Sequence, residues 1–140
     1  MNHFSLCLLL ALLLALVCGD PVYTLNIRNE NSWYDFHYST TKVSSGDLVW
    51  KGKGPGKIAA DTTATYHFTS MSDYKTTATV TWVTHTMFGN PKEEIIMDIR
   101  IDERGYLVSF YCEIVDAKRE RRSCKGYREH YEVNVFVDTS

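Results

Sequence analysis

Apolar and polar residues alternate in short runs along most of the chain after residue 21. Branched and aromatic side chains dominate these runs, as in TTATVTWVTH, and such side chains fit the half-buried surface of a pleated strand. Turn-forming stretches such as NEN, SSGD and GKGPGK separate the runs. The pattern predicts strands and no convincing helix. The expected strands cover residues 22–28, 33–40, 47–52, 63–70, 76–85, 93–101, 106–115 and 127–137.

About eight short strands at regular spacing are typical of an antiparallel β-sandwich. The length of 140 residues favours one domain, and we find no internal repeat. We therefore expect an all-β fold, a single antiparallel sandwich, that follows a separate N-terminal segment.

That N-terminal segment reads MNHFSLCLLLALLLALVCGDP. Its apolar run over 6–17 carries no charge and ends in the small-residue pattern VCG, which predicts a secretory signal peptide over 1–19 and a β-sandwich domain over 20–140. The run is short for a membrane span. Lipidation of Cys18 is an alternative, but Val17 fits a lipoprotein motif poorly. We expect a secreted, extracellular protein.

Signal removal leaves Cys112 and Cys124 in an oxidising compartment, where they should form a disulfide. A bridge over so short a loop contributes about 3 kcal/mol to stability. Two thiols alone form neither a zinc site nor a CxxC redox motif, so a structural role is the better interpretation.

The charge balance is 15 basic against 17 acidic residues. A general nucleic-acid binder would show a marked basic excess, so we expect no nucleic-acid partner.

Motifs of common enzymes and metal sites are not found. The chain has no G-x-S-x-G, no H-E-x-x-H, no phosphate-binding glycine loop and no EF-hand spacing. His37, His67 and His85 fall on three predicted strands and could converge on a metal, but dispersed histidines more often lie singly on a sheet face. We expect no enzymatic activity, catalytic residue, cofactor or metal.

Aromatic residues make up 13% of the chain and supply candidates for a contact surface. In WYDFHY both faces of a predicted strand carry aromatic rings. One face should therefore pack in the core, and the other should be exposed to solvent or bind a ligand. Most such rings fill cores. A few at loop ends would suit lipid headgroups or sugar faces, and our candidates are Trp33, Tyr34 and Trp50.

The layout NIRNENSW, SGD, GPGKIAADTTATYHFTSMSD and TATVTWV, within residues 23–83, resembles that of small cytolysin and lectin sandwiches. These are the aegerolysins, the actinoporins and the fungal fruit-body lectins. The resemblance implies a β-sandwich that recognises membrane lipid or glycan, sometimes with pore formation. The chain departs from the actinoporins because strand signals begin where their amphipathic N-terminal helix would lie. The aromatic residues of their lipid pocket have no match here, so no residue role is transferred.

Near the C-terminus, CEIVDAKRERRSCKGYREHY crowds basic residues around the two cysteines. We expect 106–115 and 127–137 to form a hairpin bridged near its tip, with the cations in or beside the connection. Charge at such a tip can simply promote solubility, or it can attract anionic lipid headgroups. The basic residues are Lys118, Arg119, Arg121, Arg122, Lys125 and Arg128.

Part of this stretch also has the R-x-[KR]-R form of a furin-type processing site, formed by Arg119, Arg121 and Arg122. Cutting after Arg122 would leave the last residues tethered by the predicted disulfide. Because we expect this loop to be exposed, replacing Arg121 and Arg122 should change the stability by no more than about 0.5 kcal/mol.

The sequence therefore predicts a recognition protein of cell surfaces, with membrane lipid headgroups as the first ligand class and glycans as the second. A different class remains open: a secreted ligand or defence factor that binds an extracellular protein through the basic hairpin. The sequence does not predict the oligomeric state.

Overall fold

The computed structural model describes residues 21–71, 75–85 and 91–139, and these form ten strands and no helix. The predicted signal peptide lies outside the described residues. The strands are β1 (Val22–Asn29), β2 (His37–Ser45), β3 (Val49–Trp50), β4 (Thr62–Thr69), β5 (Thr76–His85), β6 (Pro91–Ile101), β7 (Leu107–Asp116), β8 (Arg121–Ser123), β9 (Lys125–Arg128) and β10 (Glu132–Val137).

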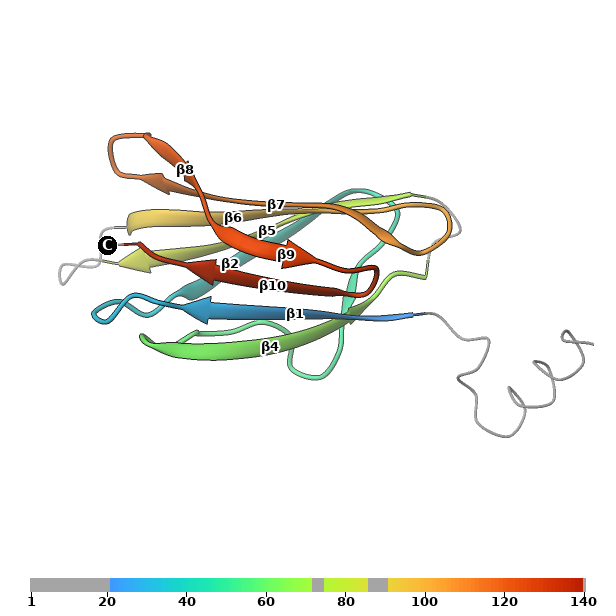
Figure 1. Ribbon diagram of the computed structural model, residues 1–140, viewed down its shortest axis with the longest axis horizontal. Helices are drawn as coiled ribbons and strands as arrows, with labels where there is room; N and C mark the ends of the chain where they lie inside the picture. Colours follow the sequence, from blue (N-terminus) through green and yellow to red (C-terminus); the bar gives the residue numbers. More distant parts are fainter. Residues whose placement is uncertain (1–20, 72–74, 86–90, 140) are drawn as a thin grey trace, which may run out of the picture.

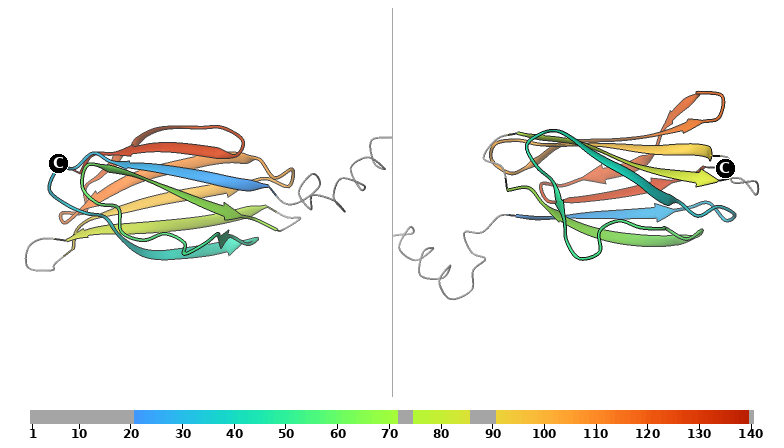
Figure 2. Two further views of the ribbon diagram at one scale, coloured as in Figure 1. Left: turned by 90° about the horizontal axis from the view of Figure 1, so that it is seen from below. Right: turned by 180° about the vertical axis from the view of Figure 1, so that it is seen from behind.

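Two five-stranded sheets pack face to face (Figures 1 and 2). One sheet has the order β3-β4-β1-β10-β9 and the other the order β2-β5-β6-β7-β8. Neighbouring strands are antiparallel except β1 and β10, which pair in parallel with Leu25 opposite Val133. The expected all-β sandwich is confirmed.

The core lies between the sheets and follows the period of two that the sequence shows. Along β1 the buried side chains are those of Tyr23, Leu25, Ile27 and Asn29, and the residues between them point outward. Trp82 of β5 is fully buried, and its indole N–H donates to the Gly56 carbonyl at 3.1 Å. Burial of each large apolar side chain stabilises the fold by about 1.5–3 kcal/mol.

The predicted strand over 33–40 is wrong at its beginning. β2 starts at His37, and residues 30–35 form a loop that ends where Phe36 pairs with Ile58 in an isolated bridge. Buried asparagines hold this loop through side-chain hydrogen bonds, which replace the ladder that a strand would make.

The predicted C-terminal hairpin is also wrong. β7 forms its hairpin with the short β8, where Ile114 lies opposite Arg122. The chain then leaves that sheet at Cys124, and β9 and β10 join the other sheet. The 127–137 segment is therefore two strands with a turn at 129–131.

The described part of the chain holds no helix of the length and apolar character that crossing a membrane requires.

Candidate surface-binding site

The loop after β1 and the turn after β7 lie at the same end of the sandwich. β1 and β10 run in parallel and end together, with Asn29 opposite Val137. The Arg122 guanidinium donates to the carbonyl of Asp138, just beyond β10, at 3.0 Å. Figure 1 shows the β7–β8 hairpin at the end that carries the C-terminus. We call the loop 30–35, the turn 117–120 and residues 138–139 the Trp33 end.

Trp33 projects from this end with 87% of its surface exposed. The loop that carries it is fixed from inside by Asn31, which is 3% exposed. The Asn31 side-chain oxygen accepts from the backbone N–H groups of Trp33, at 2.7 Å, and Tyr34, at 2.9 Å. Its amide nitrogen donates to the Thr139 hydroxyl at 2.5 Å.

Asn29, which is fully buried, supplies a second set of bonds to the same loop. Its side-chain oxygen accepts from the Asn31 N–H at 2.9 Å, and its amide nitrogen donates to the Tyr34 carbonyl at 2.9 Å. Tyr34 itself is half-buried. The loop therefore presents one indole to solvent on a backbone held by two buried amides.

The turn at the tip of the β7–β8 hairpin presents Lys118 and Arg119. The Asp116 carboxylate accepts from the backbone N–H groups of Lys118 and Glu120, both at 2.9 Å. Arg119 has a φ of 67°, in the left-handed region that favours glycine. Both cationic side chains are exposed, and within the described residues neither forms an ion pair.

The other predicted cations do not join this tip. Arg121 pairs with Glu113 at 2.5 Å, and Arg122 pairs at 3.4 Å with Glu93, whose side chain is 6% exposed. Lys125 lies on β9. The Arg128 guanidinium donates to the carbonyl of Leu107 at the start of β7, the end remote from the tip. The sequence cluster is thus divided among four places.

The pair with Glu93 corrects our expectation about stability. Because Arg122 compensates a carboxylate that is largely removed from water, its replacement should cost more than an ordinary surface substitution. Lys118 and Arg119 are the better positions for testing charge.

Trp50 lies elsewhere. It is half-buried on β3, its ring centroid is 5.4 Å from that of Phe68, and its indole N–H donates to the Thr41 hydroxyl at 3.1 Å. β3 pairs with the end of β4, which faces the beginning of β1. Trp50 therefore packs beside the core in the half of the molecule remote from Trp33.

The predicted disulfide joins Cys112 and Cys124, with their Cα atoms 5.3 Å apart. It lies where the chain passes from one sheet to the other, and not near a hairpin tip. The Cys124 N–H also donates to the Cys112 carbonyl at 2.9 Å. The bridge fixes the crossing to the middle of β7.

The three histidines do not converge. The rings of His37 and His85 lie edge to face with centroids 5.3 Å apart, but His67 lies in the other sheet and hydrogen-bonds to Thr24. The described residues contain no group of three or more side chains that could hold a metal ion.

The opposite end of the sandwich carries a structural turn between β6 and β7. Desolvation by itself would raise the pKa of Asp102, but hydrogen bonds from the Tyr106 and Arg104 N–H groups and the Arg104 guanidinium hold this pKa below its ordinary value. The guanidinium lies 4.7 Å from the centroid of the Tyr106 ring, which also stacks on His130 at 4.0 Å. We therefore assign Asp102, Arg104 and Tyr106 a structural role in supporting the turn between β6 and β7.

Sequence reasoning missed Asn29 and Asn31, which build the Trp33 loop. The available signal was the pair of asparagines in NEN, because asparagine side chains readily bond to nearby backbone groups. In comparisons with known proteins, no family model matches the chain and no curated protein matches it either. The resemblance to cytolysin and lectin sandwiches remains an expectation from sequence.

Proposed function

We propose that this is a secreted recognition protein that binds membrane lipid headgroups through the Trp33 end. The observation that carries the proposal is the 87% exposed indole of Trp33, which two buried asparagines hold at the same end as Lys118 and Arg119. Tryptophan is favoured at membrane interfaces because its ring is apolar and its N–H is polar.

The cations fit the same ligand class. Lys118 and Arg119 stand on an exposed turn without carboxylate partners among the described residues, so their charge is available to anionic headgroups. Each such cation contributes about 1 kcal/mol near a charged membrane surface. Arg119 also occupies a backbone conformation that costs a non-glycine residue about 1–2 kcal/mol, which favours a role for its side chain.

Vesicle sedimentation tests the proposal directly. The purified protein is mixed with vesicles of phosphatidylcholine alone, with added phosphatidylserine, or with added sphingomyelin. We expect the protein to pellet with the phosphatidylserine vesicles. Raising the salt from about 0.15 M to about 1 M should weaken this pelleting, because the screening length falls from about 8 Å to about 3 Å.

Matched variants locate the contact. Replacing Lys118 and Arg119 together by serine should lower the affinity for anionic vesicles about 30-fold, the equivalent of two cations. Lys51→Ser with Lys75→Ser is the control, because it changes the net charge equally in the half remote from the tip. Trp33→Ser should also weaken binding. Equal pelleting of all four proteins would overturn the proposal.

The alternative is a ligand for an extracellular protein that uses the β7–β8 hairpin. This alternative predicts that the protein pellets with none of the vesicles. It also predicts that the protein binds to cells, and that this binding is abolished when protease removes the surface proteins. The Lys118 and Arg119 variant should lose that binding as well.

A further inference from the structure

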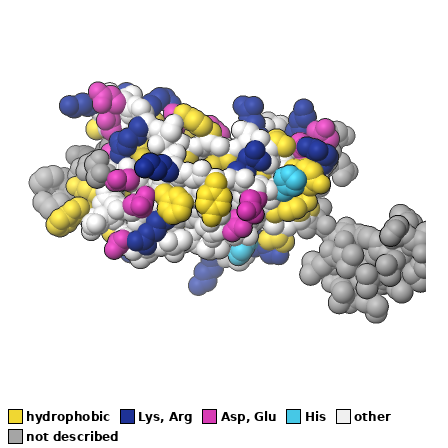
Figure 3. Space-filling model, viewed as in Figure 1, with side chains coloured by type: hydrophobic (Ala, Val, Ile, Leu, Met, Phe, Trp, Pro, Cys, Tyr) yellow, Lys and Arg dark blue, Asp and Glu magenta, His cyan; other side chains and the backbone are white. Residues whose placement is uncertain are grey.

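The sheet that contains β4, β1, β10 and β9 has an exposed outer face distinct from the Trp33 end. Two aromatic rings lie on it: Tyr127 of β9 is 57% exposed and Phe136 of β10 is 39% exposed. Asn134 lies opposite Tyr127 and Phe136 lies opposite Lys125, so the two aromatic residues are diagonal neighbours on one face. Diagonal neighbours on adjacent strands are usually about 7–8 Å apart, which is within reach of aromatic side chains. In Figure 3, hydrophobic side chains are exposed in the middle of this face.

A ladder of polar side chains continues from these rings along the same face. The Asn26 amide nitrogen donates to the Glu132 carboxylate at 2.9 Å and to the Asn134 side-chain oxygen at 3.0 Å. The Asn26 side-chain oxygen accepts from the Thr65 hydroxyl at 2.6 Å. Because Glu132 can only accept, this pattern fixes the orientation of both amides.

The ladder leaves hydrogen-bonding groups that face solvent. Within the described residues, the Asn134 amide nitrogen and the second carboxylate oxygen of Glu132 have no partner, and neither is a buried unsatisfied atom. The Asn134 amide offers donors, and the Glu132 carboxylate offers an acceptor. Both are held in place before any ligand arrives, which lowers the entropy cost of binding.

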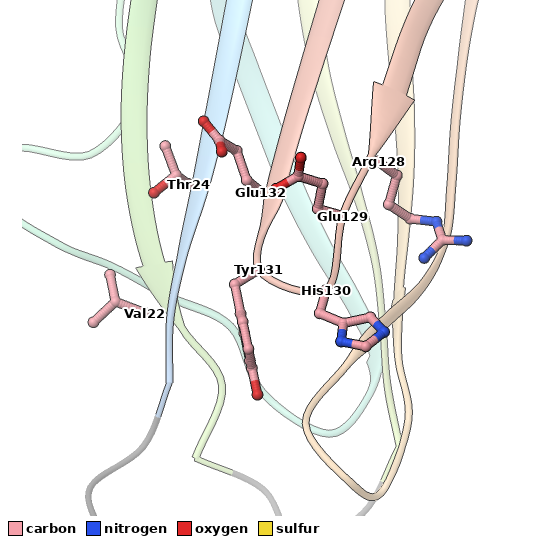
Figure 4. Close-up of a pocket in the computed structure, with 7 residues that line it drawn as sticks. All are labelled: Val22, Thr24, Arg128, Glu129, His130, Tyr131 and Glu132. Atoms are coloured by element: carbon pink, nitrogen blue, oxygen red, sulfur yellow. The ribbon is translucent and has the colours of Figure 1, made fainter. Parts of the chain in front are cut away.

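Beyond Glu132 the face opens into a shallow hollow of about 710 Å³. Figure 4 shows the side chains around it, which come from β1, β9, β10 and the turn between the last two. Tyr131, 42% exposed, lies on this turn. Four residue steps along β10 separate Glu132, at the rim of the hollow, from Phe136, a distance of about 13 Å.

We infer that this face binds a glycan chain of β-linked pyranose units, aligned with β10. A pyranose ring has an apolar C–H face that can lie on Tyr127 and Phe136, and hydroxyl groups at its edge that can bond to Asn134 and Glu132. The inference goes beyond the proposed function, because it places the second ligand class on another surface.

The chemistry of the face favours a glycan over other occupants. Of the two cations beside Phe136 in the register, Arg28 is already paired with Asp61, and Lys125 is a single charge on the edge strand. Two exposed rings in a largely polar surface are too little for a stable dimer, which buries about 800 Å² on each partner. Neutral hydroxyl groups match the amide and carboxylate that the ladder presents.

Retention on insoluble polysaccharides tests the inference. The purified protein is incubated with cellulose, chitin and β-1,3-glucan, with α-linked starch as the comparison. We expect retention on at least one β-linked polymer and none on starch. Salt at about 1 M should leave retention unchanged, because these polysaccharides carry no charge whose attraction ions could screen.

Variants separate this site from the Trp33 end. Replacing Tyr127 and Phe136 together by serine should lower the affinity for the retained polymer at least about tenfold, with vesicle binding unchanged. Trp33→Ser should weaken vesicle binding and leave the affinity for the polymer unchanged. Thermal melts establish that each variant is folded, and single Tyr127→Ser and Asn134→Ala variants replace the double variant if it does not fold. The inference is overturned if no β-linked polymer retains the wild type, or if the aromatic variants bind as the wild type does.

Discussion

Asn31 shows how a single buried side chain fixes the position of an exposed one. It makes three hydrogen bonds, two that it accepts from the backbone beside Trp33 and one that it donates to Thr139. The bonds tie the loop to the last described residues of the chain. Trp33 is exposed because of this arrangement, since the loop cannot turn its indole toward the core.

Asn31→Ala should therefore destabilise the protein by about 2–4 kcal/mol, because it leaves two backbone N–H groups without an acceptor in a partly buried loop. Ser32→Ala is the control, since Ser32 is exposed in the same loop and should change stability by no more than about 0.5 kcal/mol. Urea unfolding measures both. Equal midpoints for the two variants would contradict the role of Asn31.

Arg119 gives a second test at the scale of one residue. Its φ of 67° disfavours any side chain with a Cβ, so Arg119→Gly should leave stability unchanged or raise it by up to about 1 kcal/mol. Arg119→Ala keeps the backbone penalty and should show no gain. Both should bind anionic vesicles less tightly than the wild type. A glycine variant that is less stable than the alanine variant would refute this account of the turn.

Among the elements, β8 and the crossing after it distinguish this sandwich from a simple series of hairpins. β8 is short and lies at the edge of its sheet, where β7 is its only neighbour among the described residues. The disulfide between Cys112 and Cys124 holds the point where the chain changes sheet. The edge strand and the crossing are thus fixed by one covalent link.

Replacing Cys112 and Cys124 by serine should lower the free energy of unfolding by about 3 kcal/mol, the loop-closure value for a separation of 12 residues. Urea unfolding measures this change. Intact mass of the wild type before and after reduction should differ by two hydrogens. No difference in mass would show free thiols and would contradict the bridge.

The predicted processing site also lies partly on β8, which contains Arg121 and Arg122. Arg121 and Arg122 pair with Val115 and Ile114, so a protease that needs an extended, unpaired segment must first detach the strand. We expect a furin-type protease to cut the folded wild type slowly, and to cut the Cys112→Ser, Cys124→Ser variant faster. The readout is a reducing gel. Protein collected from secreting cells as two fragments would show that the strand opens readily.

At the scale of the whole molecule, the three tryptophans occupy three environments. Trp82 is fully buried, Trp50 is half-buried beside Phe68, and Trp33 is 87% exposed at one end. Lys118 and Arg119 are exposed at the same end, and the outer face of one sheet, with Tyr127 and Phe136, lies along the side. We propose that these two separate surfaces bind different ligand classes.

Membrane binding through the Trp33 end should therefore protect mainly one indole from water. Adding phosphatidylserine vesicles should shift the tryptophan emission to shorter wavelength and reduce its quenching by acrylamide. Trp33→Phe should abolish both changes, because Trp82 is fully buried and Trp50 is half-buried in the half of the molecule remote from Trp33. Pelleting of the wild type with unchanged quenching would mean that another surface meets the lipid.

The sequence by itself determined the fold class and most of the strands. TTATVTWVTH is β5 over its full length, because alternation with branched side chains leaves one face to bury. It also determined the disulfide, since only two cysteines lie beyond the predicted signal peptide. These features depend on local spacing, on side-chain type or on a count, and all of them can be read along the chain.

Only the tertiary structure decided which strands are neighbours and where the site residues lie. β1 pairs with β10, more than 100 residues away, and that pairing brings the Trp33 loop to the C-terminus. Ion pairs with Glu113 and Glu93 divided a basic cluster that looks continuous in sequence. Trp33 and Trp50 have the same side chain, and one is exposed while the other packs beside Phe68. The physical reason is that exposure and pairing depend on contacts between segments remote in sequence, which alternation within a segment does not specify.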